Sequence, residues 1–228
     1  VVALALSAGP VAAQDATPVG VPAGLSPVVD NPLFPLALTP IKVYIGEEED
    51  PETGETIALR VEEIVRPLPA EVAGIEVTVV DVTEYEDGEL VEVTEDYYAQ
   101  DEEGAVYYIG EAVDNYEDGE VVDHEGEWLA GEGDNQAGVF MPADPQEGDS
   151  FEQERAPGIA EDRSTVIAVD QAVSTDAGEF EGCIQTEDYA PLDDVTEYKF
   201  YCPEVGQVRE EFEGGFLDLV WFSEPREG

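Results

Sequence analysis

The sequence predicts a mainly β protein: a single antiparallel β-meander whose sheet is strongly curved or forms a partly open barrel. Gly and Pro interrupt the chain at intervals of about ten residues. The segments between them alternate apolar and polar residues, and none sustains the 3.6-residue period of a helix. Asp87-Gly88 and Asp118-Gly119 are dipeptides typical of tight β-hairpins. Together these features favour consecutive strands joined by short turns.

Each expected strand is a short run of alternating or β-branched residues that ends at such a turn. From Ile41 onward the expected strands are Thr56–Arg66, Ile75–Tyr85, Glu89–Ala99, Val106–Glu111, Glu120–Leu129, Ser150–Arg155, Ser164–Val173, Glu179–Tyr189, Thr196–Cys202, Gln207–Phe212 and Phe216–Phe222. Within Ile75–Tyr85 the apolar residues change face between Val79 and Val80. This phase slip predicts a β-bulge.

The chain carries 56 Asp and Glu against 8 Lys and Arg, a formal net charge of -48 over 228 residues. Such a surface repels phosphate backbones and anionic lipids, which argues against nucleic-acid partners. Hydrophobic residues make up 43% and aromatic residues 9%, so the chain is not a disordered acidic tail. Three causes of the acidity stay open: adaptation to high salt, an acidic style shared by the secreted proteins of the source, and specific binding of cations.

The first 40 residues are expected to lie outside the main domain. Val1–Ala13 is uncharged and apolar, as in the end of a signal peptide. Residues 14–40 are Pro-rich and predict a flexible leader, whose apolar end Asn31–Leu36 docks first on the domain. Residues 41–228 then form a single acidic β domain. No other apolar run could span a membrane, so we expect an extracytoplasmic protein, secreted or in the cell envelope.

Cys183 and Cys202 lie in two expected strands joined by the turn-like stretch Ala190–Val195. When the chain folds back between Leu192 and Asp193, Cys183 falls opposite Cys202. This register suits a cross-strand disulfide, which agrees with an oxidising compartment. Two buried free thiols remain the alternative.

Motifs for catalysis are missing from the sequence. His124 is the single histidine, and its acidic neighbours in a polar strand are typical of a solvated residue. There is no nucleophile elbow, zinc-protease motif or phosphate-binding loop. Carboxylate pairs for an acid–base hydrolase are compatible with so acidic a chain, but their abundance makes them uninformative. We therefore predict that the protein is not an enzyme and needs no cofactor.

Calcium is the most plausible inorganic ligand because it prefers hard oxygen ligands on turns. The candidate ligands form two groups, Asp114, Asn115 and Asp118 in one, and Asp134 and Asn135 in a Gly-rich loop in the other. None has the spacing of an EF-hand. Solvated acidic turns are the alternative at each site.

An aromatic cluster is the most distinctive pattern. Its members, in neighbouring expected strands, are Tyr97, Tyr98, Tyr107, Tyr108, Tyr116 and Trp128. Strand alternation places Tyr97 and Tyr107 on one face and Tyr98 and Tyr108 on the other. One set is expected in the core. The other set either lines a concave sheet face that binds an apolar or glycan ligand, or packs within a second core.

The same region carries a family resemblance. The run Asp96-Tyr97-Tyr98-Ala99-Gln100-Asp101, then Gly104, then Val106-Tyr107-Tyr108-Ile109-Gly110-Glu111, resembles a family of exported bacterial proteins of unknown function. The similarity extends over roughly residues 31–212. It implies an exported, mainly β domain and no established activity. The chain departs from the pattern at Ala37–Pro40, where a Pro-Gly turn is expected.

These observations predict a non-catalytic, exported binding or cell-envelope accessory domain that is adapted to high salt. Its partner would be a small molecule, a glycan, an envelope protein or cations. A calcium-binding extracellular structural protein is the alternative, and an acid–base hydrolase is the third possibility. The sequence does not identify the ligand.

Overall fold

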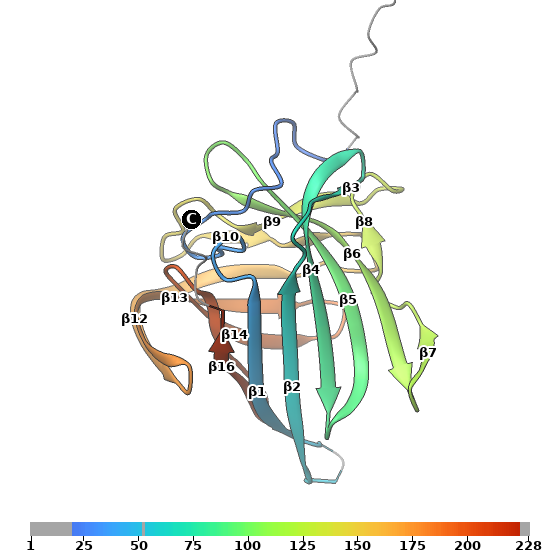
Figure 1. The fold of residues 1–228 in the computed structure, drawn as a ribbon, viewed down its shortest axis with the longest axis vertical. Helices are drawn as coiled ribbons and strands as arrows, with labels where there is room; N and C mark the ends of the chain where they lie inside the picture. Colours follow the sequence, from blue (N-terminus) through green and yellow to red (C-terminus); the bar gives the residue numbers. More distant parts are fainter. Residues whose placement is uncertain (1–19, 52, 224–228) are drawn as a thin grey trace, which may run out of the picture.

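The computed structural model describes residues 20–51 and 53–223, in which sixteen antiparallel strands and no helix are found (Figure 1). The strands are β1 (Ile41–Glu49), β2 (Thr56–Val65), β3 (Ala70–Val72), β4 (Ile75–Glu86), β5 (Glu89–Gln100), β6 (Val106–Glu117), β7 (Glu120–Asp123), β8 (Trp128–Leu129), β9 (Gln136–Met141), β10 (Ser150–Glu152), β11 (Glu154–Arg155), β12 (Arg163–Thr175), β13 (Gly178–Ala190), β14 (Val195–Cys202), β15 (Gly206–Phe212) and β16 (Gly215–Phe222). This confirms the predicted fold class. No helix among the described residues could span a lipid bilayer.

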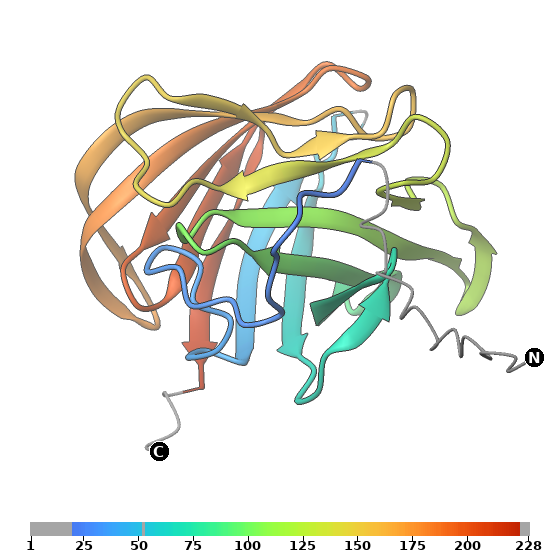
Figure 2. The ribbon, with the colours of Figure 1, turned by 90° about the horizontal axis from the view of Figure 1, so that it is seen from above.

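One curved sheet contains every strand, in the order β10-β12-β13-β14-β15-β16-β1-β2-β4-β5-β6-β9-β11, with β3, β7 and β8 paired alongside. Seen from above, the sheet curves round on itself, so that its first and last strands lie close together (Figure 2). The first strand, β1, pairs with the last strand, β16. The edge strands β10 and β11 are consecutive in the chain and are separated by Gln153 alone. The sheet therefore comes near to closure without closing into a barrel.

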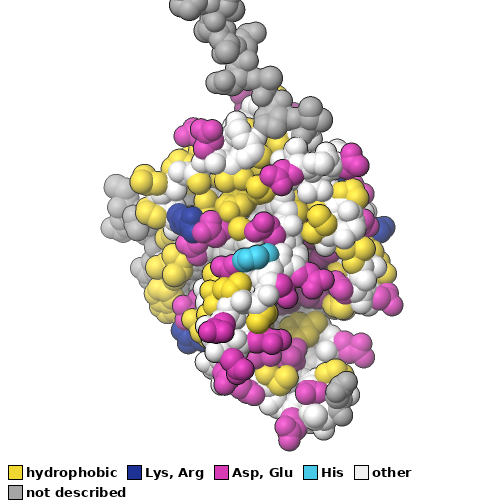
Figure 3. Space-filling view, turned by 90° about the vertical axis from the view of Figure 1, so that its right-hand side faces the viewer, with side chains coloured by type: hydrophobic (Ala, Val, Ile, Leu, Met, Phe, Trp, Pro, Cys, Tyr) yellow, Lys and Arg dark blue, Asp and Glu magenta, His cyan; other side chains and the backbone are white. Residues whose placement is uncertain are grey.

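The hairpins that join neighbouring strands use the predicted turns. Asp87 and Gly88 connect β4 to β5 with φ values of 50° and 84°, and Asp118 and Gly119 connect β6 to β7 with 53° and 78°. Two successive positive φ values are those of a type I′ turn, whose twist matches that of the flanking strands. Both turns carry acidic side chains into solvent, and Asp and Glu are spread over the face shown in Figure 3.

The predicted bulge between Val79 and Val80 is wrong. Both residues are buried, and the pairing of β4 with β5 runs through them without interruption; its irregularity lies between Glu84 and Tyr85. The apolar residues change face because both faces of β4 are covered at this point. Val77 pairs with Ala70 of the short strand β3, whereas Val80 lines the cavity on the concave side.

Residues 20–40 are packed against the sheet, which corrects the expectation of a flexible leader over this part. Val29, Phe34 and Leu36 are buried. The side-chain amide of Asn31 donates hydrogen bonds to the backbone carbonyls of Gly104 and Pro142 at 2.8 and 3.1 Å. Buried apolar area and satisfied polar groups thus offset the ordering of this segment. Asn31–Leu36 docks as expected, and Val1–Ala13 lies outside the described residues.

The disulfide and its hairpin follow the predicted register. Cys183 and Cys202 are bonded, with Cα atoms 4.1 Å apart. Along the same hairpin, Ile184 pairs with Tyr201 and Tyr189 with Thr196. Ile184 and Tyr201 are buried as expected. The two cysteines are buried as well, because they belong to a second apolar cluster that also contains Val208 and Leu219.

Candidate functional site

The concave side of the sheet encloses a cavity of about 1100 Å³. Its wall includes twelve Asp and Glu side chains and one basic side chain, Lys199. Strands β1, β2, β4, β5, β14 and β15 supply most of the acidic groups. A cavity of this size can hold a small organic ligand. The excess of carboxyl groups makes its interior strongly negative, so charge alone disfavours anionic ligands.

Aromatic rings form one wall of this cavity. Tyr98 and Tyr108 are a cross-strand pair of β5 and β6, and their rings stack with centroids 4.9 Å apart. Phe140 contacts both rings, at 5.0 and 5.9 Å, and Phe34 lies 4.6 Å from Phe140. Trp128 packs edge-on against Tyr108 at 5.6 Å. The result is a continuous aromatic surface beside the acidic groups.

A bulge in β6 brings Glu111 to the same side as these tyrosines. Tyr98 pairs with Tyr108, whereas Asp96 pairs with Glu111, so Ile109 is an extra residue in β6. Paired residues share a face. Because Asp96 and Tyr98 are two positions apart on β5, Glu111 and Tyr108 both point to the concave side although they are three positions apart. The bulge thus redirects a carboxyl group toward the aromatic wall.

Three carboxyl groups gather near the tyrosine hydroxyls, and we call Asp96, Glu111 and Glu154 the carboxyl cluster. Asp96 accepts hydrogen bonds from Thr94 Oγ1 at 2.8 Å and from the Tyr98 hydroxyl at 3.4 Å. None of the three has a Lys, Arg or His ion-pair partner among the described residues. Neutral hydroxyl donors stabilise the Asp96 carboxylate, and Lys199 attracts the Glu154 carboxylate from beyond ion-pair distance.

Burial raises the pKa of each member of this cluster. It raises the pKa of Asp96 to about 7, and burial with repulsion from Asp96 raises the pKa of Glu111 to about 9. The pKa of Glu154 rises to about 8 through burial and the charge of Asp162. On β4, burial and Glu92 raise the pKa of Glu84 to about 7. Water reaches part of each side chain through the cavity, yet protein surrounds them closely enough to disfavour ionisation.

Lys199 on β14 holds a separate group of acids. Its ammonium nitrogen lies 2.9 Å from Glu197, 3.8 Å from Asp188 and 3.9 Å from Glu210. Lys199 lowers the pKa of Glu197 by attraction, whereas burial raises the pKa of Glu210. The pKa of Lys199 itself is raised well above its ordinary value, because these acids outweigh the desolvation of the ammonium group. Lys199, the basic residue of the cavity wall, is therefore already shared among three acidic side chains.

Unsatisfied polar atoms lie beside Lys199 on the same side of the sheet. Asp188 is 5% exposed, and neither of its carboxylate oxygens accepts a hydrogen bond from the described residues. The hydroxyls of Ser164 and Thr186, also buried, have no partner there either. Asp188 pairs across the strands with Glu197, and Thr186 with Lys199. These atoms therefore lie on the concave face of the sheet, behind the residues that form the cavity wall.

The structure separates the predicted aromatic residues into two groups. Tyr98 and Tyr108 line the cavity and Trp128 supports them, whereas Tyr97 and Tyr107 lie on the other face, as predicted. Tyr107 lines a second cavity of about 470 Å³ and donates to Asp101 at 3.4 Å. Tyr116 is half-buried in the β6–β7 hairpin and is not part of the cavity wall.

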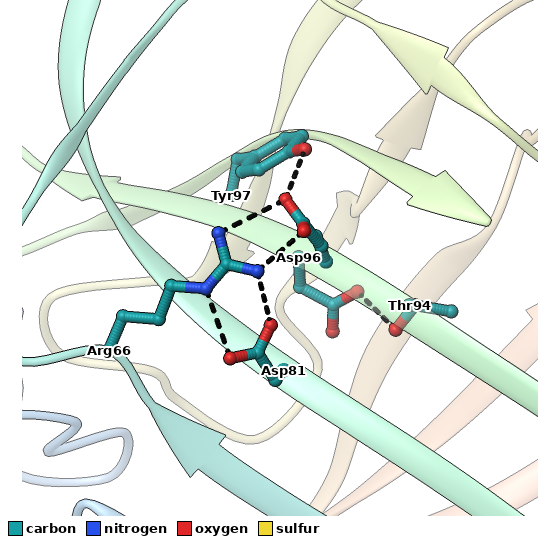
Figure 4. A network of polar contacts seen from close by, with 6 residues as sticks. Arg66, Asp81, Thr94, Asp96 and Tyr97 are labelled. Atoms are coloured by element: carbon teal, nitrogen blue, oxygen red, sulfur yellow. Dashed lines mark hydrogen bonds and ion pairs between the residues drawn. The ribbon is translucent and has the colours of Figure 1, made fainter. Parts of the chain in front are cut away.

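On the outer face of the sheet, opposite the cavity, Tyr97 belongs to a polar network around Arg66. The Arg66 guanidinium donates to both oxygens of Asp81, at 3.0 and 2.6 Å, and also to Glu95. The Tyr97 hydroxyl donates to Glu95 at 3.2 Å. Figure 4 shows this network beside Asp96 and Thr94. Since Asp96 shares a strand face with Tyr98, Arg66 compensates charges of the outer face and leaves the carboxyl cluster unpaired.

The predicted calcium ligands lie on turns and strand ends. Asp114 contacts the ring of His124 at 2.9 Å, and Asn115 donates to Asp123 at 2.7 Å. Asp118 is in the β6–β7 turn, and Asp134 and Asn135 are in the loop before β9. No three His, Cys, Asp or Glu side chains within residues 20–51 and 53–223 are grouped so as to hold a metal ion. His124 is exposed, as expected, and lies outside the cavity wall.

Sequence reasoning missed Asp96, Glu154 and Lys199, which line the cavity, and Glu111, which interacts with Asp96 and Glu154 from beside it. Asp96 could have been found, because it stands two positions before Tyr98 and so shares its face. Glu111 required knowledge of the bulge. Glu154 and Lys199 required the tertiary arrangement of β11 and β14.

Comparisons with known proteins find one weak structural similarity and no sequence match. A scan against protein-family models finds no match, and no curated protein matches the chain. Among solved structures, the chain is similar to a protein of Parabacteroides distasonis that is described as a putative lipoprotein. The two are 14% identical, and the alignment covers 84% of this chain and 98% of that chain with a TM-score of 0.38. This similarity is too low to support an argument about function.

Proposed function

We propose that the protein is a non-catalytic, exported binding or cell-envelope accessory domain whose ligand occupies the concave cavity. The observation that carries this proposal is the cavity of about 1100 Å³, with an aromatic wall formed by Tyr98, Tyr108 and Phe140. Enclosed spaces with aromatic rings and a few oriented polar groups are typical of small-molecule sites. The buried disulfide is typical of oxidising compartments and supports export.

Tryptophan fluorescence tests the proposal. The chain has two tryptophans, Trp128 against the aromatic wall and Trp221 at 51% exposure on β16. In a Trp221→Phe variant, Trp128 becomes the sole tryptophan and reports on the cavity. We expect its emission to change on titration with a ligand from a panel of glycans, lipids, amines and organic acids. Tyr108→Leu should abolish the change. No response to any member of the panel would contradict the binding function.

A second candidate, an acid–base hydrolase, is favoured by one specific observation. Asp96, Glu111 and Glu154 have raised pKa values in a cavity, and carboxyl groups of this kind serve as general acids or bases in enzymes. Hydrolysis of glycosides or esters that disappears in Asp96→Asn would favour this candidate. Binding without turnover by the unchanged protein would favour the binding domain.

A further inference from the structure

We propose that the cavity takes an organic cation, a ligand with a primary ammonium group on an aromatic or aliphatic body. The ammonium group binds at Asp96 and Glu154, the two members of the carboxyl cluster that line the cavity, and the body lies against the aromatic wall. This inference rests on the binding function proposed above and names the chemical class of the ligand.

The charge of the wall is the first argument. Twelve acidic side chains face one basic side chain, and the ammonium group of Lys199 is already shared among Glu197, Asp188 and Glu210. An anionic ligand would find no free cation here and would be repelled. A cationic ligand would relieve the mutual repulsion of the carboxyl groups, which gives binding an electrostatic driving force.

Unused acceptors provide an independent argument. Asp188 is more than nine-tenths buried, and neither carboxylate oxygen accepts a hydrogen bond from the described residues. Nearby, the Ser164 and Thr186 hydroxyls are also unpartnered. Lys199 lies 3.8 Å from Asp188, beyond hydrogen-bond distance, so the Asp188 oxygens can still accept hydrogen bonds from an added donor. Ammonium groups offer three donors and no acceptor, which matches the acceptors on this face of the sheet, behind the cavity wall.

The aromatic wall provides a third argument. The stacked rings of Tyr98 and Tyr108 adjoin Phe140, with centroids 4.9 to 5.9 Å apart. Ring faces attract cations, and Tyr and Phe platforms next to carboxylates bind ammonium ligands by both effects. The combination favours an organic cation over a bare metal ion. No three metal-binding side chains are suitably grouped in the described part of the chain.

Protons compete with such a ligand at the same carboxyl groups. Other charged and titratable groups facing them are Glu63 of β2, Glu84 of β4, Glu92 and Tyr98 of β5, Tyr108 of β6, Asp162, and Lys199 of β14. Most are acidic, so they oppose ionisation until a cation arrives. Ligand binding should therefore release protons and strengthen with rising pH.

Calorimetric titration of the full chain with three probes of one shape tests the ligand class. The probes are phenethylamine, the neutral phenethyl alcohol and the anionic 3-phenylpropionate, at constant ionic strength. At pH 8 we expect phenethylamine to bind at least tenfold more tightly than either analogue. Its affinity should fall at least tenfold at pH 5.5, and its binding heat should depend on the ionisation heat of the buffer.

Two variants locate the ammonium group. Asp96→Asn and Glu154→Gln each keep the shape of the side chain and remove its charge, and each should weaken phenethylamine binding about tenfold. Glu120→Gln on β7 removes one exposed charge and serves as the matched control, with unchanged affinity. Melting temperatures confirm that each variant is folded.

The outcomes distinguish failure of the cationic ligand class from failure of the binding function itself. Equal affinity for phenethylamine and phenethyl alcohol would overturn the cationic class and leave the binding cavity standing. Competition by calcium chloride at matched ionic strength, with no preference between the organic probes, would overturn it in favour of a metal site. Failure of all three probes to bind would overturn the cationic class; the binding function would fall with it only if the fluorescence panel were also silent.

Discussion

Gly110 of β6 lies so close to Trp128 of β8 that a Cβ atom on Gly110 would overlap the Trp128 carbonyl oxygen. It would also lie 2.9 Å from the Cα of Leu129, and Gly110 has a φ of 134°. This close approach holds β8 against β6 and places the Trp128 ring against Tyr108.

Gly110→Ala should therefore destabilise the fold by about 3 kcal/mol or more, since it combines overpacking with backbone strain. Denaturant unfolding followed by Trp128 fluorescence in the Trp221→Phe background measures the change. Gly88→Ala is the control: Gly88 has a φ of 84° but no heavy atom within 4 Å of an added Cβ. Its cost should stay near 1 kcal/mol, and equal costs would contradict a packing role for Gly110.

Stability should fall as pH rises from about 5 to about 9. Asp96, Glu84, Glu154 and Glu111 have folded-state pKa values of about 7, 7, 8 and 9. An unfolded carboxyl group titrates near pH ~4, so the folded chain binds more protons across this range. The free energy of unfolding must then decrease with pH, and thermal melts at constant ionic strength measure the slope. A melting temperature that rises over this range would contradict the raised pKa values.

Asp96→Asn should be stabilising at pH 8 and nearly neutral at pH 5. The amide oxygen can still accept from Thr94 and Tyr98, while the buried charge is removed. Allowing for water in the cavity, we expect a gain of about 1–2 kcal/mol at pH 8, or a few degrees in melting temperature. Loss of stability at both pH values would mean that the Asp96 carboxylate is structurally required.

Lys199→Met should be among the most destabilising substitutions in the cavity. It leaves Asp188, Glu197 and Glu210 without their cation, which costs about 3–5 kcal/mol when a buried pair is broken. The loss should be smaller at pH 5, where the acids are more readily protonated, and Glu197→Gln in the same chain should recover part of it. Arg60→Met removes an exposed cation paired with Glu62 and should cost under ~1 kcal/mol.

Removal of the disulfide should cost about 3 kcal/mol. Cys183 and Cys202 close a loop with a sequence separation of 19, and the crosslink restricts the unfolded chain. Chemical unfolding of Cys183→Ala/Cys202→Ala, with and without a reducing agent, measures the contribution. Reductant should destabilise the unchanged protein and leave the double variant as it was. An unchanged midpoint in the double variant would show that the apolar cluster alone holds this end of the sheet.

Screening should raise the melting temperature steeply between low salt and about 1 M sodium chloride, where the Debye length falls to ~3 Å. With a net charge of -48, repulsion among the acidic side chains destabilises the compact folded state. Calcium chloride at matched ionic strength separates screening from specific binding: a further increase that chelator reverses would favour the calcium hypothesis. A flat response to sodium chloride would contradict adaptation to high salt.

The local features of this chain could be predicted because they depend on short-range rules. Strand alternation separated Tyr97 from Tyr98, and the disulfide register followed from one turn. The cavity could not be predicted in the same way, since Lys199 and Glu154 line it from strands far away in the sequence from Tyr98. The position of Glu111 opposite Asp96 depends on a bulge. The phase slip at Val79 and Val80 was misinterpreted because alternation cannot distinguish a bulge from a strand that is covered on both faces.

The two edge strands bear on how the protein avoids assembling with itself. β10 has three residues and β11 has two, and each is already paired with one neighbour. Few backbone groups remain open to a strand from another molecule, and the charged side chains of Glu152 and Arg155, 3.1 Å apart, lie on these short strands. Even where salt screens the acidic surface, we therefore expect little edge-to-edge aggregation, because few unpaired backbone groups are available to pair with another sheet.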